Sequence, residues 1–152
     1  LRIIIENQFD PTSNNFAYML SKHDCFRKLT GKCSLQLTTR QKRRYKFNDK
    51  IFVKGRYWDY KANSVYYCPL LLKSIIDKGM QNRVELNPHS CGHYSFSEGQ
   101  HRTCVAKTSG IHGIPANIHD KWSSECRVCY FKKNNLKFKV KNLLGKTKDF
   151  VR

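Results

Sequence analysis

Acidic residues are scarce in this chain of 152 residues, which has 11 Asp and Glu against 29 Lys and Arg. Metal-dependent cleavage of nucleic acid uses several clustered carboxylates, so this scarcity argues against a nuclease. The formal net charge of +18 instead favours a polyanionic partner. We therefore expect nucleic acid among the partners of this protein.

The chain also lacks long apolar runs, internal repeats and a secretory signal. No hydrophobic stretch approaches the roughly 20 residues of a membrane span, and the opening Leu-Arg-Ile-Ile-Ile-Glu is too short and too soon charged for a signal peptide. Hydrophobic residues make up 39% of the chain, which is too many for a disordered one. We expect a soluble, cytoplasmic protein with no membrane partner. The first residue is not methionine, which allows an excised fragment or a processed product.

Basic residues gather in two stretches. Nine of them, with two acids, lie between residues 40 and 61 among several aromatic residues, and eight, with one acid, lie between residues 131 and 152. Aromatic rings between cations suit stacking on unpaired bases as well as contact with phosphates. The same alternation is typical of the inner face of a β-hairpin with lysines on its wet face. As candidate nucleic-acid contacts we single out Arg40, Lys42, Arg43 and Arg44.

The seven cysteines are an odd number, and without a secretory signal they are poor evidence for disulfides. Cys126 and Cys129 form a C-x-x-C pair, the spacing that lets two thiolates hold one tetrahedral zinc ion. The candidate second pairs are Cys25 and Cys33, with His23 nearby, or Cys91 with His89 or His93. Structural zinc at Cys126, Cys129, Cys25 and Cys33 and a set of free cysteines are the two main hypotheses. A thiol-redox pair is less favoured, because no thioredoxin-like context surrounds the motif.

The order of patterns predicts an α+β fold with a small mixed β-sheet and flanking helices, in a single domain. Its core is expected at 44–120, with an N-terminal extension over 1–43 and a basic C-terminal segment over 121–152. Helices are predicted over 16–29, 69–79 and from about 100 to 110, and strands over 44–58, 64–68, 83–86, 93–96, 111–118 and 136–141. Pro115 suggests that the strand over 111–118 is an edge strand.

The most informative segment is Ser95–Gly110, in which a short alternating strand runs into Glu98-Gly-Gln-His-Arg102 and then a helix of small residues. Backbone N–H groups and the positive helix end point at such a turn, which makes it a seat for an anion. His101 and Arg102 stand beside it, and the expected ligand is a phosphate. The alternative is structural, with Arg102 pairing with a neighbouring carboxylate and Gly99 serving as an ordinary turn glycine.

Together with the flanking elements, the Gly-Gln-His-Arg turn resembles the ParB/sulfiredoxin superfamily, and ParB-like domains most closely, over about Tyr67–Ile118. The resemblance implies a nucleoside triphosphate, bound with Mg²⁺, and in several members its hydrolysis or phosphoryl transfer. Gln100 occupies the place of the catalytic cysteine of sulfiredoxin, so reduction of sulfinic acids is not expected.

Carried over by position, the resemblance makes Gly99, Gln100, His101, Arg102 and Thr103 the phosphate-binding residues. Glu98 and His101 are then the candidate catalytic residues, with Glu98 holding a metal ion or positioning a water. The main hypothesis is a nucleotide-binding enzyme or switch with a basic surface for nucleic acid. The alternative is a nucleic-acid-binding module without catalysis, in which the turn contacts a backbone phosphate.

Overall fold

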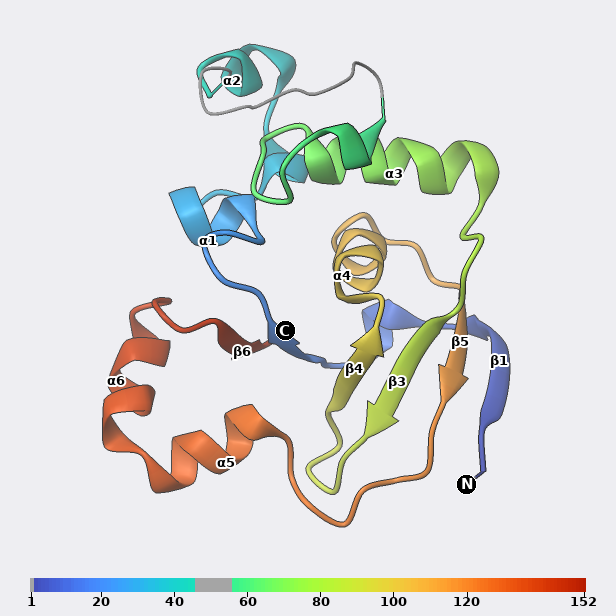
Figure 1. Cartoon of the computed structure of the whole chain (residues 1–152), viewed down its shortest axis with the longest axis vertical. Coiled ribbons are helices and arrows are strands. Elements are labelled where there is room, and N and C mark those ends of the chain that lie inside the picture. Colours follow the sequence, from blue (N-terminus) through green and yellow to red (C-terminus); the bar gives the residue numbers. More distant parts are fainter. Residues whose placement is uncertain (1, 46–55) are drawn as a thin grey trace. The chain divides into compact units, whose positions relative to one another are not determined.

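The computed structural model describes residues 2–45 and 56–152 (Figure 1). The chain forms two compact units, one made of Leu1–Met19 with Met80–Arg152 and the other of Leu20–Gly79. These limits differ from the predicted boundaries of a single core at 44–120. The segment Leu20–Gly79 is therefore inserted into a unit whose own chain is discontinuous.

The discontinuous unit contains a mixed four-stranded sheet, as expected from the sequence. Its strand order is β1 (Ile4–Phe9), β5 (Ile114–Ile118), β3 (Val84–Pro88) and β4 (Tyr94–Glu98). β3 and β5 are parallel, and the other two pairs are antiparallel. A separate two-stranded sheet joins β2 (Ala17–Met19) to β6 (Asp149–Val151).

Aromatic side chains fill much of the core of this unit. Phe16 is completely buried, and its ring stacks on Phe96 with 5.4 Å between centroids. Phe96 in turn stacks on Tyr18, which stacks on Phe150 of β6. Aromatic contacts of this kind add to the stabilisation that burial of the ring area provides. The column of rings therefore ties β2 and β6 to the edge strand β4.

The strand containing Pro115 is central rather than at the edge, so that prediction is wrong. β5 lies between β1 and β3, and its pairing with β1 is irregular between Glu6 and Phe9. Pro115 lies opposite this irregular stretch, between the register pairs formed by Ala116 and Ile114. A bulge leaves a residue without a ladder partner, which is how a proline without an N–H fits an inner strand.

The C-terminal part is helical where a strand was predicted. α5 (Arg127–Asn134) is followed by α6 (Leu136–Leu143), so the prediction of a basic strand over 136–141 is wrong. Asn135 caps α6, because its side chain accepts a hydrogen bond from the N–H of Phe138 at 3.0 Å. Apolar residues at 136, 140, 143 and 144 also fit a helical period better than an alternating one.

The inserted unit contains α1 (Phe26–Thr30), α2 (Thr39–Arg43), α3 (Tyr67–Lys78) and short 3-10 helices over Ser34–Gln36 and Tyr57–Asp59. α3 confirms the predicted helix, and Gly79 ends it with a φ of 71°. The predicted helix over 16–29 is wrong, because β2 occupies 17–19 and α1 begins only at Phe26. The predicted strand over 64–68 is also wrong, because α3 begins at Tyr67. Most of the predicted strand over 44–58 lies outside the described residues.

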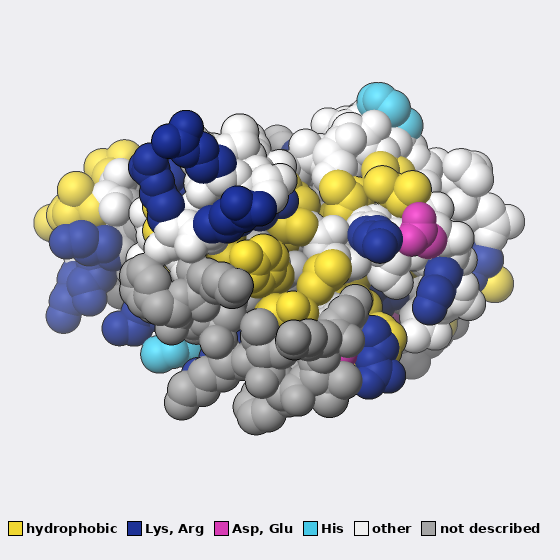
Figure 2. Space-filling model, turned by 90° about the horizontal axis from the view of Figure 1, so that it is seen from above, with side chains coloured by type: hydrophobic (Ala, Val, Ile, Leu, Met, Phe, Trp, Pro, Cys, Tyr) yellow, Lys and Arg dark blue, Asp and Glu magenta, His cyan; other side chains and the backbone are white. Residues whose placement is uncertain are grey.

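None of the described helices has both the length and the apolar character that crossing a membrane requires. On the face of the molecule shown in Figure 2, basic side chains are widespread and acidic ones are few.

Candidate metal centre and anion-binding turn

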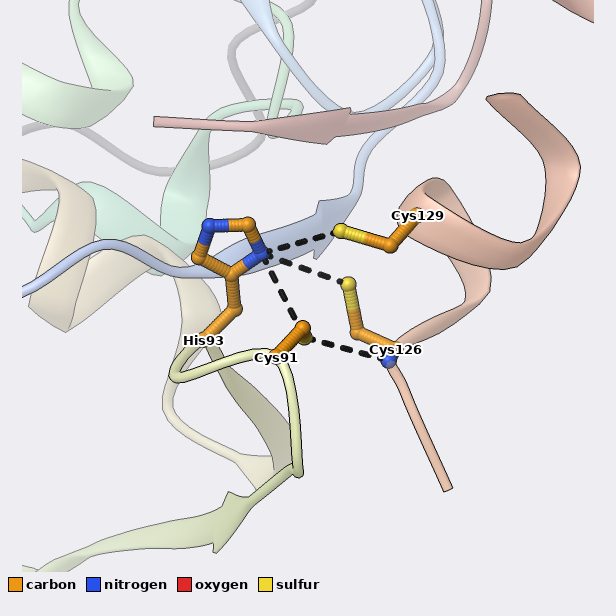
Figure 3. A group of neighbouring side chains, drawn as sticks. All are labelled: Cys91, His93, Cys126 and Cys129. Carbon is orange, nitrogen blue, oxygen red and sulfur yellow. Dashed lines mark hydrogen bonds between the residues drawn. The ribbon is translucent and has the colours of Figure 1, made fainter. Parts of the chain in front are cut away.

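Three cysteines and one histidine converge in the discontinuous unit (Figure 3). The Nδ1 atom of His93 lies 3.5 Å from the sulfur of Cys91, 3.5 Å from that of Cys126 and 3.4 Å from that of Cys129. All four candidate ligand atoms lie within 4.8 Å of one another. The group could therefore hold a metal ion.

Two separate elements supply these side chains. Cys91 and His93 lie in the hairpin turn between β3 and β4, and Gly92 between them has a φ of 83°. This left-handed conformation is accessible to glycine without steric cost, and it lets the turn reverse so that both flanking side chains face one point. Cys126 is the N-cap of α5 and Cys129 lies in its first turn. The N–H of Cys126 donates to the sulfur of Cys91 at 3.4 Å, which joins the two elements.

The three thiols have different tendencies to ionise. Burial alone would raise the pKa of Cys91, but N–H groups of Cys126 and His93 donate to its sulfur and leave that pKa below its ordinary value. Burial raises the pKa of Cys126. Burial, and then hydrogen bonding and negative charge at Cys126, raise the pKa of Cys129 to about 12. A bound cation would offset this mutual repulsion and favour three thiolates.

His93 is suited to act as a ligand rather than as a cation. Burial, followed by the positive charge of Lys132 and then the electrostatic influence of the neighbouring His89, lowers the pKa of its imidazole. Metal ions bind neutral imidazole, so this shift favours coordination through Nδ1.

The structure corrects the predicted ligand set. Cys126 and Cys129 belong to the cluster, but Cys25 and Cys33 lie in the inserted unit and take no part in it. Their place is taken by Cys91 and His93, which the sequence offered as an alternative. The signal was present as a Cys-Gly-His tripeptide between two strand patterns. Its pairing with a motif more than 30 residues away depends on the tertiary fold, which the spacing alone did not reveal.

The predicted strand, glycine turn and helix are all present at the candidate anion site. β4 ends at Glu98, Gly99 has a φ of 100°, and α4 (Gln100–Thr108) begins at once. A Cβ atom on Gly99 would lie 2.6 Å from Cγ1 of Val84 and 3.2 Å from its Cα. Gly99 is therefore needed both for its backbone conformation and for the close approach of the turn to β3.

Side chains of the turn are engaged within the protein. Arg102 donates to the backbone carbonyl of Asn82, and its guanidinium lies 3.5 Å from the carboxylate of Glu98. The amide oxygen of Gln100 accepts a hydrogen bond from the N–H of Met19 at 2.7 Å. These contacts match the structural alternative for Arg102, and they fasten the first turn of α4 to β2 and to the start of β3.

The other predicted residues of the turn differ in exposure. Glu98 is well exposed, with 67% of its side-chain surface accessible. His101 is half-buried, and Thr103 is fully buried in the core. No protein partner of the Thr103 hydroxyl is found among the residues that the structure describes. Thr103 thus lies under the turn rather than on its accessible surface.

The four predicted nucleic-acid contacts lie together in the inserted unit. Arg40, Lys42 and Arg43 belong to α2, and Arg44 is its C-cap. The three arginines are exposed and Lys42 is half-buried. A capping box between Thr38 and Gln41 fixes the start of this helix. Phe47 and Phe52, which alternate with cations in the sequence, lie outside the described residues.

No protein-family model matches this chain, and comparison with curated proteins gives no significant match. The resemblance to ParB-like domains therefore stays a prediction.

Proposed function

We propose that this protein binds nucleic acid through basic surfaces. We also propose that a structural zinc ion holds α5 against the hairpin turn between β3 and β4. The observation that carries the binding proposal is a set of lysines on α5, α6 and the segment leading to β6. The set consists of Lys132, Lys137, Lys139, Lys141, Lys146 and Lys148. All six are exposed, and among the described residues none of them forms an ion pair with a carboxylate. We call this set the lysine arm.

Unpaired lysines in such number raise the local positive potential, and a phosphate backbone is a polyanion that matches it. The lysine arm also carries little negative charge, since residues 131–152 contain one acid, Asp149. That carboxylate is buried and lies 3.5 Å from the guanidinium of Arg127. The exposed charged groups of the arm are therefore almost all positive. The arginines of α2 provide a second basic surface in the inserted unit.

The zinc proposal is supported by the separations between the ligand atoms. A tetrahedral ion with Zn–S bonds of about 2.3 Å and Zn–N bonds of about 2.0–2.1 Å sets its nitrogen and sulfur ligands roughly 3.6 Å apart. The observed distances from His93 Nδ1 to the three sulfurs are 3.4–3.5 Å. Four protein ligands are typical of closed, structural zinc sites, so the ion would fasten α5 to the β3–β4 hairpin.

Binding of nucleic acid by the lysine arm is expected to weaken steeply with salt. If all six lysines contact phosphates of a single strand, log affinity should fall against log salt concentration with a slope of about −4. Replacing Lys137, Lys139 and Lys141 by glutamine should reduce the slope by about 2. The measurement is fluorescence anisotropy of a labelled oligonucleotide at several salt concentrations.

The matched control replaces three exposed lysines of the inserted unit, Lys32, Lys61 and Lys73, by glutamine. It removes the same charge and should leave the slope closer to that of the original protein. A flat salt dependence would contradict nucleic-acid binding. Equal slopes for the two triple variants would contradict the assignment to the lysine arm.

Nucleotide binding at the turn is a second candidate function. Two observations support it: α4 begins directly after β4, and the positive φ of Gly99 makes the sharp turn that leads from the strand into the N-terminus of the helix. The triphosphate would lie at the first turn of α4 with Mg²⁺ offsetting its charge, and Glu98 is exposed nearby. Arg102 would exchange its contact with Glu98 for a phosphate oxygen.

Titration of the four ribonucleoside triphosphates with Mg²⁺ tests this second function. At least one should bind below millimolar concentration, and Arg102→Ala should weaken its binding at least about tenfold, the scale of one lost charge-assisted hydrogen bond. Arg102→Lys keeps a positive charge and serves as the folded comparison, since Arg102 also bonds the carbonyl of Asn82. Equal binding by the Ala variant and the original protein would rule out a role for Arg102.

A further inference from the structure

A cavity of about 370 Å³ lies within the discontinuous unit. Residues of β2, β3, β4, α5 and β6 line it, together with Gln100 at the start of α4. Its volume falls within the range of about 300–1,000 Å³ that is typical of small-ligand pockets. The ligand atoms of the metal centre are not part of its wall, although Arg127 and Val128, which lie between Cys126 and Cys129, are.

The polar groups of the cavity are only partly used by the protein. Asn87 donates from its amide nitrogen to the hydroxyl of Ser97 at 3.0 Å, and the amide oxygen of Gln100 accepts from Met19. Among the described residues, the amide oxygen of Asn87 and the amide nitrogen of Gln100 have no partner. The cavity thus offers an acceptor and a donor of the amide type, which complement the hydrogen-bonding edge of a nucleobase.

His89 forms a fixed part of the wall. Its Nδ1 lies 3.3 Å from the carbonyl oxygen of Ser124, which can only accept, so Nδ1 carries the proton. Its Nε2 then accepts from the hydroxyl of Ser95 at 2.6 Å. Both ring nitrogens are used, and the residue is only 7% exposed. His89 therefore supports the cavity instead of offering a hydrogen bond to a ligand.

An exposed indole stands at the rim. Trp122 lines the cavity and is 54% exposed, while its ring lies 5.4 Å from that of His89. Its backbone N–H donates to the carbonyl of Pro88 at 2.8 Å, which fixes the segment to the end of β3. A large aromatic ring held in place but left exposed provides a surface on which a base can stack. The exposed guanidinium of Arg127 lies on the same wall.

The geometry points to a nucleobase site: an unpaired base stacks on Trp122 and its edge enters the cavity toward Asn87 and Gln100. This inference rests on the proposed nucleic-acid function, because the charge of the protein selects a strand as the source of the base. A free nucleotide offers the same chemistry, and the experiment separates the two sources. Arg127 would contact the phosphate attached to the bound base.

Tryptophan fluorescence can test this site, because the chain has two tryptophans with nearly equal exposure. Trp122 is 54% exposed and Trp58, in the inserted unit, is 53% exposed. Trp58→Phe leaves Trp122 as the only indole. A single-stranded homopolymer of each base should quench its emission, whereas an abasic strand of the same length should not. Trp122→Ala should weaken strand binding by about tenfold, and Trp58→Ala should weaken it less.

Blocking the cavity provides the second test. Ser97 is exposed on β4 and lines the cavity, so Ser97→Met should fill part of it without disturbing the core. This variant should lose the base-dependent quenching of Trp122 and keep the salt-dependent binding of an abasic strand. Ser123→Met, an exposed site outside this cavity, is the matched control and should behave as the original protein.

The outcomes distinguish the two proposals. Salt-dependent binding with equal quenching by base-bearing and abasic strands would overturn the nucleobase site and leave the proposed function intact. If no strand binds, the proposed function fails, and titration with nucleoside monophosphates then tests whether the cavity binds a free nucleotide. Their quenching of Trp122, abolished by Ser97→Met, would support the cavity as a site for free nucleotides. No quenching by either source would overturn the nucleobase site.

Discussion

Replacing Cys126 by serine is expected to abolish binding of the proposed zinc ion and to lower the midpoint of thermal unfolding by more than about 10 °C. Cys126 is fully buried, caps α5 and lies 3.5 Å from His93 Nδ1. Loss of one ligand opens the site and leaves the other thiols without the cation that stabilises them. At about 2–4 °C per kcal/mol for a chain of this size, this shift corresponds to roughly 3–5 kcal/mol.

The cysteines of the inserted unit are the controls for this prediction. Cys25 and Cys33 are half-buried and precede short helices as N-caps, where serine is favourable. The double variant Cys25→Ser, Cys33→Ser should keep about one equivalent of zinc and its thermal midpoint. His93→Cys should keep zinc in a four-cysteine site, whereas His93→Ala should lose it.

Elemental analysis of protein purified without chelator measures the metal directly. Less than half an equivalent in the original protein would exclude a zinc site of physiological strength. Full metal content in Cys126→Ser would contradict both ligand sets, and loss of zinc in Cys126→Ser and also in the Cys25 and Cys33 variant would restore the ligand set predicted from sequence.

Replacing Gly99 by alanine should be among the most destabilising single changes in the chain. Its φ of 100° disfavours any other residue, which costs about 1–2 kcal/mol. The new methyl group would also collide with Val84, and overpacking of this kind costs a further ~1–3 kcal/mol. We expect the free energy of unfolding to fall by about 2–5 kcal/mol, as measured by urea denaturation.

Gly110 separates these two contributions. Its φ is also positive, at 72°, but a Cβ atom there would meet nothing within 4 Å. Gly110→Ala should therefore cost only the backbone term of about 1–2 kcal/mol. An equal loss of unfolding free energy in both variants would show that the contact of Gly99 with Val84 does not require glycine. The close approach to β3 would then not explain the glycine in this turn.

The elements that were predicted correctly have local signals. Helix α3 has a proline in its first turn and a glycine at its end. Helix α4 begins directly after Gly99, which itself follows a strand pattern. In each case the chemistry of one or two residues fixes the backbone at an element boundary. The C-x-x-C motif likewise identified half of the candidate metal site from its own spacing.

The errors have physical causes of two kinds. At α6 the short alternating pattern predicts a strand, but the cap at Asn135 and the helical spacing of Leu136, Val140 and Leu143 favour the helix that forms. At β2 and at the metal centre, the partner comes from a distant part of the chain. Tyr18 faces Phe150 across the β2–β6 pair, and no local pattern predicts such a contact.

The discontinuity of the larger unit has a consequence for the order of folding. Phe16 exchanges two backbone hydrogen bonds with Arg152, at 2.8 and 2.9 Å, so the two strands of the small sheet meet only after the chain has been made as far as Arg152. Such high contact order slows folding, because the entropy of closing the loop is lost before the contacts form. The segment Leu20–Gly79 is contiguous and has no such delay. During synthesis it can become compact before β3 to β6, the partners of residues 2–19, have been made. The aromatic side chains of Phe9, Phe16 and Tyr18 are therefore transiently exposed to solvent.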